Sequence, residues 1–577
     1  MALKPTRVVL PNGLTVIAKA NHTSPTVSVL VGVRTGAYAD PPEKDGTAAL
    51  CARVLDRGTS KRSAEAIADE LDGRGASLSV IAGRHQMALA ATCLAEDFEP
   101  VLTLVADVAR HPGFADKEIA TRREQLITSI RQEEDNPATM AGDAFAKALY
   151  GDHPYGRKVR GTIQGLESIR RQDLVRFHQK GFDPPTMTVV VVGDLVEDAA
   201  IAAITKLFGS WTSLSKPTDT PVVKVPDPAM ATERRLVPVP MMNKSQADVV
   251  YGFVGVKRSD PEYHAISVMN NALGQYAIGG RLGDSIRERQ GMAYYVFSSL
   301  DASFGPGPFS IRAGVAASNV EKTISSIDQE LDLVLTKGFT AQEIDESKSY
   351  MIGSLPRQLE TNAAIGSFLL NVETFGLGLD YDERLPGLIG AVTKEAADAA
   401  ARRMLNPLKA TIGVAGPWTP GMAVVSASGP APATVAETSA IATPPGPATV
   451  VETPAIATAP PPQAVAATPA IAIAPAPPTV AGPSEIASPP PAADLPTSPG
   501  PASPVEAAKD PDSSPLLDLD ALFAPPPSPP AGSATGSGET APETPSATEA
   551  RALTPDQPKP DPPPLGKAPS SAGETGS

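Results

Sequence analysis

The sequence predicts an α+β fold of two homologous α/β-sandwich domains, each with a mainly antiparallel sheet and flanking helices, followed by a disordered tail. Residues 1–212 mix alternating apolar segments, typical of strands, with apolar residues at helical spacing. Residues 234–420 repeat this order, and from residue 421 onward proline, alanine, threonine and serine dominate. The folded part, about 415 residues, is long enough for two domains of about 200.

The first domain, residues 1–212, begins with an alternating hairpin and a second alternating strand. Pro137 ends a long charged helix, because proline cannot continue the hydrogen-bond ladder and restricts the residue before it. The expected strands are 8–16 (the hairpin), 26–34, 76–82, 86–93 and 186–193, and the expected helices are 43–56, 63–71, 98–108, 117–134, 140–150, 166–180 and 197–211.

A polar, proline-containing linker, residues 213–233, separates the first domain from the second, residues 234–420. Phe182-Asp-Pro-Pro precedes one apolar strand and Leu405-Asn-Pro-Leu precedes another, so the two halves have the pattern of a duplication. The expected strands of the second half are 247–254, 293–299, 308–315 and 410–415, and the expected helices are 261–273, 319–337, 341–355, 363–375 and 394–404.

The tail, residues 421–577, cannot bury enough apolar surface to offset the entropy of ordering it. It holds 15 acidic and 4 basic residues, so it carries −11 of the net charge of −15 and leaves −4 for the folded part. The segment Leu516–Phe523 is either a short helix that binds a partner or a chance apolar cluster. A repeat typical of an extended spacer begins with Ile-Ala at Ile441, Ile456, Ile471 and Ile486.

Composition excludes several classes of protein. The sequence contains no basic patch of the kind that would indicate nucleic-acid binding. Cys51 and Cys93 give no disulfide framework, and Cys51 is expected to be a small buried residue, with a catalytic nucleophile as the alternative. The N-terminus lacks the apolar core of a signal peptide, and no segment approaches the ~18 apolar residues of a spanning helix. We therefore expect a cytoplasmic protein without a membrane span.

The segment Gly46–Thr59 follows the hairpin and the strand 26–34, and this order resembles the N-terminal half of the pitrilysin/insulinase metallopeptidases, family M16. In that family the matching helix carries H-x-x-E-H, in which two histidines bind zinc and the glutamate activates water. The resemblance places Ala49 and Arg53 at the histidine positions and Ala52 at the glutamate position. Alanine has no lone pair to offer and arginine stays protonated, so this helix cannot bind zinc in that way.

The third zinc ligand of the family is a glutamate in a later helix, just before Glu-Asp-Asn-Pro. That sequence is present at Glu134–Pro137, and the ligand position falls on Thr128 or Ser129. Every metal position is therefore substituted. None of the six histidines is followed by glutamate three residues on. The resemblance implies a chain that keeps the scaffold and holds no metal, with zinc expected only in a partner subunit.

The second half keeps a different motif. Gly279–Val296 closely matches the family's C-terminal substrate motif, in which an arginine and a tyrosine seven residues later face the metal. The resemblance assigns these positions to Arg287 and Tyr294 as substrate-binding residues. Arginine supplies fixed donors to a peptide carbonyl, and a tyrosine hydroxyl can stabilise oxyanion charge. The alternative is that Arg287 forms a surface ion pair and Tyr294 packs in a strand.

A chain that has lost the zinc half and kept the Arg/Tyr half resembles the non-catalytic subunit of a heterodimeric zinc peptidase. We expect it to bind an extended peptide in a chamber shared with an H-x-x-E-H subunit and to be inactive alone. One alternative is a structural or scaffolding protein on the same fold, without any peptidase role. Another is an autonomous peptidase with a rearranged site, which the absence of clustered histidines disfavours.

Overall fold

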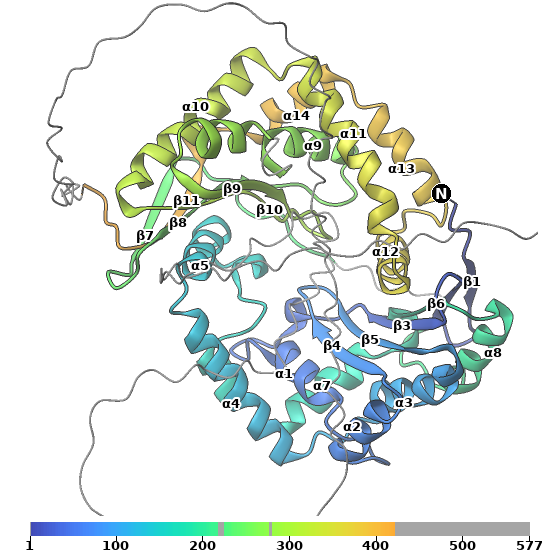
Figure 1. The fold of residues 1–577 in the computed structure, drawn as a ribbon. Helices are drawn as coiled ribbons and strands as arrows, with labels where there is room; N and C mark the ends of the chain where they lie inside the picture. The colour runs from blue at the N-terminus through green and yellow to red at the C-terminus, as the bar shows by residue number, and fades with distance from the viewer. Residues whose placement is uncertain (1, 217–223, 276–279, 422–577) are drawn as a thin grey trace, which may run out of the picture. The chain divides into compact units, whose positions relative to one another are not determined.

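The computed structural model describes residues 2–216, 224–275 and 280–421, all within one compact unit. The predicted tail, its repeat and the segment Leu516–Phe523 lie outside the described residues, as does Gly279 at the start of the Arg/Tyr motif. The predicted α+β architecture with two mainly antiparallel sheets is confirmed (Figure 1). None of the helices in the described part of the chain combines the length and the apolar composition needed to cross a bilayer.

The first sheet has the strand order β1-β2-β6-β3-β5-β4. Only β2 and β6 pair in parallel, which the long segment between them in the sequence permits, whereas the other neighbours are antiparallel. The strands β3 and β6 are almost fully buried, as expected for the centre of a covered sheet. The bounds are β1 Thr6–Val9, β2 Thr15–Ala20, β3 Thr26–Val33, β4 Ser77–Ala82, β5 Met87–Leu94 and β6 Met187–Gly193.

The helices of the first half lie near the expected positions, but the expected helix 140–150 begins at Pro137, the expected helix 197–211 ends at Phe208, and two others differ further. The expected helix 43–56 begins only at Thr47, because Gly46 has a φ of 105° and cannot continue a helix backward. The expected single helix 166–180 is wrong, since Ile169 and Arg170 are extended and divide it into α6 and α7. The bounds are α1 Thr47–Leu55, α2 Ala64–Asp72, α3 Phe98–Arg110, α4 Asp116–Glu133, α5 Pro137–Tyr150, α6 Ile163–Ser168, α7 Arg171–Gly181 and α8 Glu197–Phe208.

The second sheet repeats the plan of the first, in the order β7-β11-β8-β10-β9. Again one pair, β7 and β11, is parallel. The strand β7 was not expected, because Pro238 and Pro240 interrupt its pattern; proline is tolerated there because β7 is an edge strand. The bounds are β7 Arg235–Pro240, β8 Ala247–Val254, β9 Ala293–Leu300, β10 Pro308–Val315 and β11 Thr411–Gly416.

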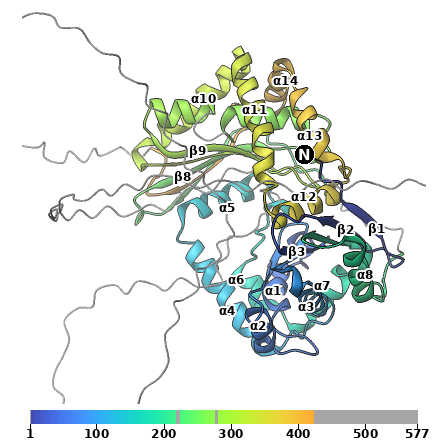
Figure 2. The ribbon, with the colours of Figure 1, turned by 45° about the vertical axis from the view of Figure 1, so that its right-hand side comes forward.

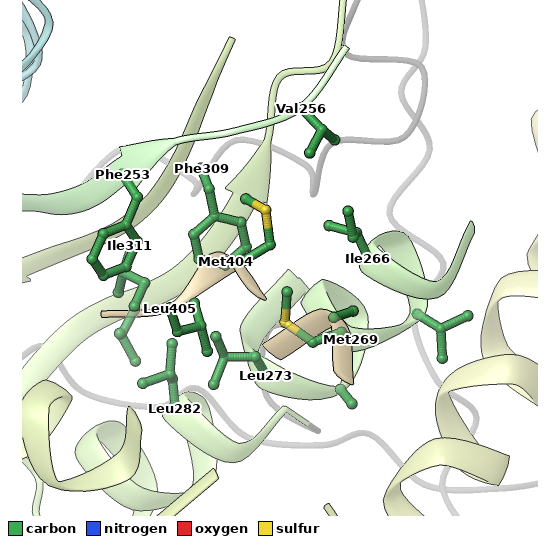
Figure 3. Packing of buried hydrophobic residues seen from close by; sticks show 14 of the residues in the cluster. Phe253, Val256, Ile266, Met269, Leu273, Leu282, Phe309, Ile311, Met404 and Leu405 are labelled. Carbon is green, nitrogen blue, oxygen red and sulfur yellow. The ribbon is translucent and has the colours of Figure 1, made fainter. Parts of the chain in front are cut away.

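Helices α9, α10 and α14 cover one face of the second sheet and enclose the larger part of its core (Figure 1). Phe309 and Ile311 of β10 face Met404 and Leu405 across this core (Figure 3). The helix α13 was missed, because Pro386 lies inside it. The bounds are α9 Tyr263–Asn270, α10 Val320–Lys337, α11 Ala341–Gln358, α12 Asn362–Phe375, α13 Tyr381–Gly390 and α14 Lys394–Met404, with π-helical segments at Asn271–Gln275 and Gly283–Arg289.

Each half contributes one helix to the other half's sheet. Helix α5 packs on β8 and β11, and α12 packs on β3 and β6 (Figure 2). Glycines permit both approaches: a Cβ on Gly413 would lie 2.4 Å from the carbonyl oxygen of Ala141 in α5, and one on Gly32 would lie 2.4 Å from Leu370 in α12. Helices α5 and α12 each cover only part of the sheet on which they pack. The edge strands, β4 of the first sheet and β9 of the second, stay only partly buried.

Candidate functional site

The helix that matches the family's zinc helix is α1, and it packs against the edge strand β4 and helix α4. Its N-terminus is held by Asp40, whose carboxylate accepts hydrogen bonds from the backbone N–H of Gly46 at 2.7 Å and of Ala48 at 2.8 Å. Burial raises the pKa of Asp40 to about 7, although the two backbone donors oppose this shift. The sequence therefore builds the helix at the expected place.

The three motif positions on α1 carry no metal donor. Ala49 is half-buried, Ala52 is buried and Arg53 is exposed. Ala49 and Arg53 are four residues apart and lie on the same face of the helix, as the histidines of an H-x-x-E-H helix would. The backbone thus retains the position of the motif while the side chains lack its chemistry.

The positions proposed for the third ligand lie on α4, which packs beside α1. Thr128 is exposed, and the hydroxyl of Ser129 donates to Glu133 at 3.2 Å. Glu133 in turn forms an ion pair with Arg160 at 2.7 Å. Among the described residues, no three histidine, cysteine, aspartate or glutamate side chains are grouped so that they could hold a metal ion. The donors present at these positions therefore do not fit the family's zinc.

Cys51 lies on the opposite side of α1, within the core of the first half. Its side chain is fully buried, and burial raises the pKa of the thiol far above its ordinary value. A nucleophile must reach its substrate and ionise, and Cys51 does neither. It is the small buried residue that the sequence predicted.

Tyr294 stands at a β-bulge at the start of β9. Gly314 of β10 pairs with Tyr295 and Val315 pairs with Ala293, so Tyr294 between them has no partner on β10. Such a bulge redirects a side chain. Tyr294 is 55% exposed, so packing in the strand, as the structural alternative describes it, covers only part of this residue.

Arg287 lies in the π-helical segment Gly283–Arg289, one turn before that bulge. Gly291 makes the turn with a φ of 60°, and its N–H donates to the carbonyl of Arg287 at 3.0 Å. The Arg287 side chain is 43% exposed and forms an ion pair at 3.6 Å with its neighbour Glu288, which is the surface ion pair that the structural alternative describes. Such an exposed pair adds little stability, so Arg287 stays accessible to a ligand.

The histidines occupy separate structural positions. His153 accepts a hydrogen bond from the backbone N–H of Tyr155 at 3.1 Å and donates one to the carbonyl of Pro226 at 2.9 Å. His85 is buried and hydrogen-bonds the hydroxyl of Tyr155 at 2.7 Å. His178 is buried and donates to the carbonyl of Ala109 at 2.8 Å. None of these contacts involves another metal donor.

Two of these histidines predict how stability depends on pH. Burial lowers the pKa of His85 to about 3 and of His178 to about 4. Because both stay neutral in the folded state, while the unfolded chain takes up protons below about pH 6.5, stability is full above that pH and is lost toward pH 4. Each should contribute about 2 kcal/mol to the loss between pH 7 and pH 5.

Urea denaturation at pH 7 and pH 5 tests this dependence. His178→Gln should reduce the difference in unfolding free energy between the two pH values by about 2 kcal/mol relative to the wild type. Carboxylates such as Asp40 contribute equally to both proteins, so the comparison isolates the histidine. An unchanged pH dependence in His178→Gln would contradict the assignment.

Sequence reasoning missed one polar group in the second half. Asp248 of β8, Tyr295 of β9 and Arg312 of β10 lie on the face of the sheet that meets α5, and the Tyr295 hydroxyl donates to Asp248. Asp248 is almost fully buried. The signal was present in the sequence, because an arginine or aspartate within an apolar strand is uncommon unless it is paired or functional.

Two family models match the chain in succession. The model described as "Insulinase (Peptidase family M16)" matches residues 15–163, and the model described as "Peptidase M16 inactive domain" matches residues 168–351. The fold, the order of its helices and strands and both family models indicate the same class of protein, the M16 peptidases. The chain belongs to the M16 peptidase family.

The chain is also similar to curated relatives and to a solved structure. It is 29% identical over 405 residues to an uncharacterized zinc protease of Mycobacterium leprae, covering 69% of this chain and 89% of the relative. It is 27% identical over 401 residues to the uncharacterized zinc protease YmxG of Bacillus subtilis, covering 69% and 95%. A crystal structure described as the peptidase M16 inactive domain from Pseudomonas fluorescens is 26% identical, with a TM-score of 0.67 over 72% of this chain and 98% of that one.

Proposed function

We propose that this chain is the zinc-free, substrate-binding subunit of a heterodimeric peptidase whose other subunit carries H-x-x-E-H. Loss of all donors at Ala49, Ala52 and Arg53 supports the absence of metal chemistry in this chain. The match of residues 168–351 to the model of the inactive domain is in keeping with this role.

The observation that carries the proposal is the accessibility of Arg287 and Tyr294. A large aromatic side chain on a bulge, 55% exposed, contributes little to packing. Exposed aromatic and arginine side chains are the residue types that most often carry binding energy. In the proposed complex, Arg287 binds a carbonyl of the extended peptide and the Tyr294 hydroxyl stabilises the developing oxyanion, while the partner supplies the metal.

The test begins with isolation from the native host. The chain should co-purify with a protein of the same fold that carries H-x-x-E-H, identified by mass, and the complex should cleave extended peptides. The purified chain alone should contain no stoichiometric zinc by elemental analysis and should cleave nothing. Chelator-sensitive cleavage by the chain alone would contradict the proposal. A complex of same-fold chains without any peptidase activity would instead support the scaffolding alternative.

A further inference from the structure

Arg312 is the charged residue of β10, and its surroundings are unusual. On the sheet it lies directly opposite Val250 of β8 and Phe297 of β9, on the face that meets α5. The rest of Pro308–Val315 is apolar or small. A guanidinium in the middle of such a strand requires a partner or a function.

The guanidinium rests against α5, at the residue where that helix has no side chain. A Cβ on Gly142 would lie 3.5 Å from both Nη1 and Nη2 of Arg312. The residue is nevertheless partly accessible to solvent. Burial among protein atoms lowers the pKa of Arg312 below its ordinary value.

No acidic group within the described residues is engaged by Arg312, either through a hydrogen bond or through an ion pair within 4 Å. The neighbouring carboxylates, Asp248 and Asp143, attract the Arg312 charge only through space and have other hydrogen-bonding partners. Asp248 accepts from the Tyr295 hydroxyl, and Asp143 pairs with Lys158 at 2.8 Å and with Arg160 at 2.5 Å.

Other arginines in the same half show what pairing looks like here. Arg281 binds Glu343 through two hydrogen bonds, at 2.9 and 2.8 Å, and Arg234 binds Asp328 through two at 2.9 Å. An unpaired charge that is mostly surrounded by protein destabilises the fold, because it loses hydration without a compensating contact. A protein retains such a group most readily where a ligand completes the pair.

Further hydrogen-bonding groups lie beside Arg312. The hydroxyls of Ser310 on β10 and Ser299 on β9 are 3.0 Å apart, on the same face and one pair further along the strands. The ring of Phe297 separates them from Tyr295 along β9. Guanidinium groups bind carboxylates with two parallel hydrogen bonds, and serine hydroxyls add a donor.

We propose that Arg312 is an anchor for a carboxylate of the bound peptide, supplied by an aspartate or glutamate side chain or by the peptide's C-terminus. The carboxylate receives two hydrogen bonds from the guanidinium, and the Ser299–Ser310 pair lies within the same site. This inference rests on the proposed peptide-binding function and names its substrate class: peptides with an acidic group at one position, rather than basic ones.

Peptide binding by the full chain alone tests the anchor without any partner subunit. The probe is a fluorescein-labelled extended peptide of twelve residues with one central glutamate, compared by anisotropy with its glutamine counterpart and with the C-terminally amidated form of each. Loss of a charge-assisted pair should weaken binding about 10- to 100-fold. If binding weakens when the glutamate is replaced by glutamine, the bound carboxylate is a side chain. If binding weakens when the C-terminus is amidated, the bound carboxylate is the C-terminus.

Arg312→Gln should abolish the preference, whereas Arg176→Gln, a matched change at an exposed arginine of α7, should leave it intact. Equal binding of all four peptides by the wild-type chain, or a preference that survives in Arg312→Gln, would overturn the inference. This experiment measures binding and no cleavage. If no zinc-bearing partner exists, the proposed function fails, but the binding comparison still decides whether Arg312 anchors a carboxylate.

Thermal unfolding distinguishes the anchor from a structural role. An unpaired charge can be removed without loss of stability, so Arg312→Met should melt at the same temperature as the wild type or above it. If Arg312 instead held Asp143 and Asp248 in place, Arg312→Met would melt several degrees lower and the inference would fail. Conservative Arg312→Lys should restore part of the peptide preference, since it retains the charge without the two-pronged geometry.

Discussion

Replacing Arg287 by alanine, or Tyr294 by phenylalanine, is expected to reduce peptide cleavage by the complex about 10²–10³-fold, the usual effect of removing one oxyanion donor. Both side chains are accessible and neither holds the fold, so assembly should be unaffected. An effect of that size from a chain without donors at Ala49, Ala52 and Arg53 would mean that one active site is shared by two subunits.

The matched control is Arg289→Ala. Arg289 lies in the same π-helical segment and is exposed, with an ion pair to Asp284 at 3.0 Å. Cleavage rates of the wild-type, mutant and control complexes are compared after size-exclusion chromatography has established equal assembly. Wild-type rates in intact Arg287→Ala and Tyr294→Phe complexes would refute the shared site.

Gly413→Ala is expected to destabilise the protein by about 2–3 kcal/mol, because overpacked substitutions force backbone shifts. The new Cβ would lie 2.4 Å from the carbonyl oxygen of Ala141 and 3.0 Å from the backbone nitrogen of Phe145, both in α5. Backbone atoms of a helix cannot rotate away as a side chain can. The change therefore pushes the helix of one half away from the sheet of the other.

Gly353→Ala is the control for this prediction. Gly353 lies in α11, and a Cβ there would meet nothing within 4 Å. Alanine favours the helix by about 1 kcal/mol over glycine, so this variant should be slightly more stable. Urea denaturation measures both. Equal stability of Gly413→Ala and the wild type would mean that α5 is not closely packed on β11.

Much of the fold could be predicted because its signals are local. The alternating residues of β3 and β10 and the helical spacing of α3 and α10 were sufficient to place these elements. The two elements that were missed entirely, β7 and α13, share one cause. Proline at Pro238, Pro240 and Pro386 contradicts the local pattern, and only the position of β7 at a sheet edge and the packing of α13 explain why it is tolerated.

In the candidate site, too, some features could be predicted from the sequence and others could not. The lack of a metal donor at Ala49, Ala52 and Arg53 follows from residue identity, since no conformation gives alanine a lone pair. The exposure of Tyr294 does not follow from residue identity, because it depends on a bulge between β9 and β10. The unpaired state of Arg312 depends on which partners Asp143 and Asp248 take, and both aspartates lie on elements far from Arg312 in the sequence.

By itself, the sequence determined that this chain has two similar α+β halves, that Ala49, Ala52 and Arg53 offer no metal donor, and that Arg287 and Tyr294 have the spacing of the family's Arg/Tyr motif. These properties depend on residue type and on spacings of a few residues. Only the tertiary structure decided that α5 and α12 each pack on the sheet of the other half, and that a guanidinium is left unpaired beside Gly142. Contacts between residues more than one hundred positions apart depend on packing and burial, which no local pattern encodes.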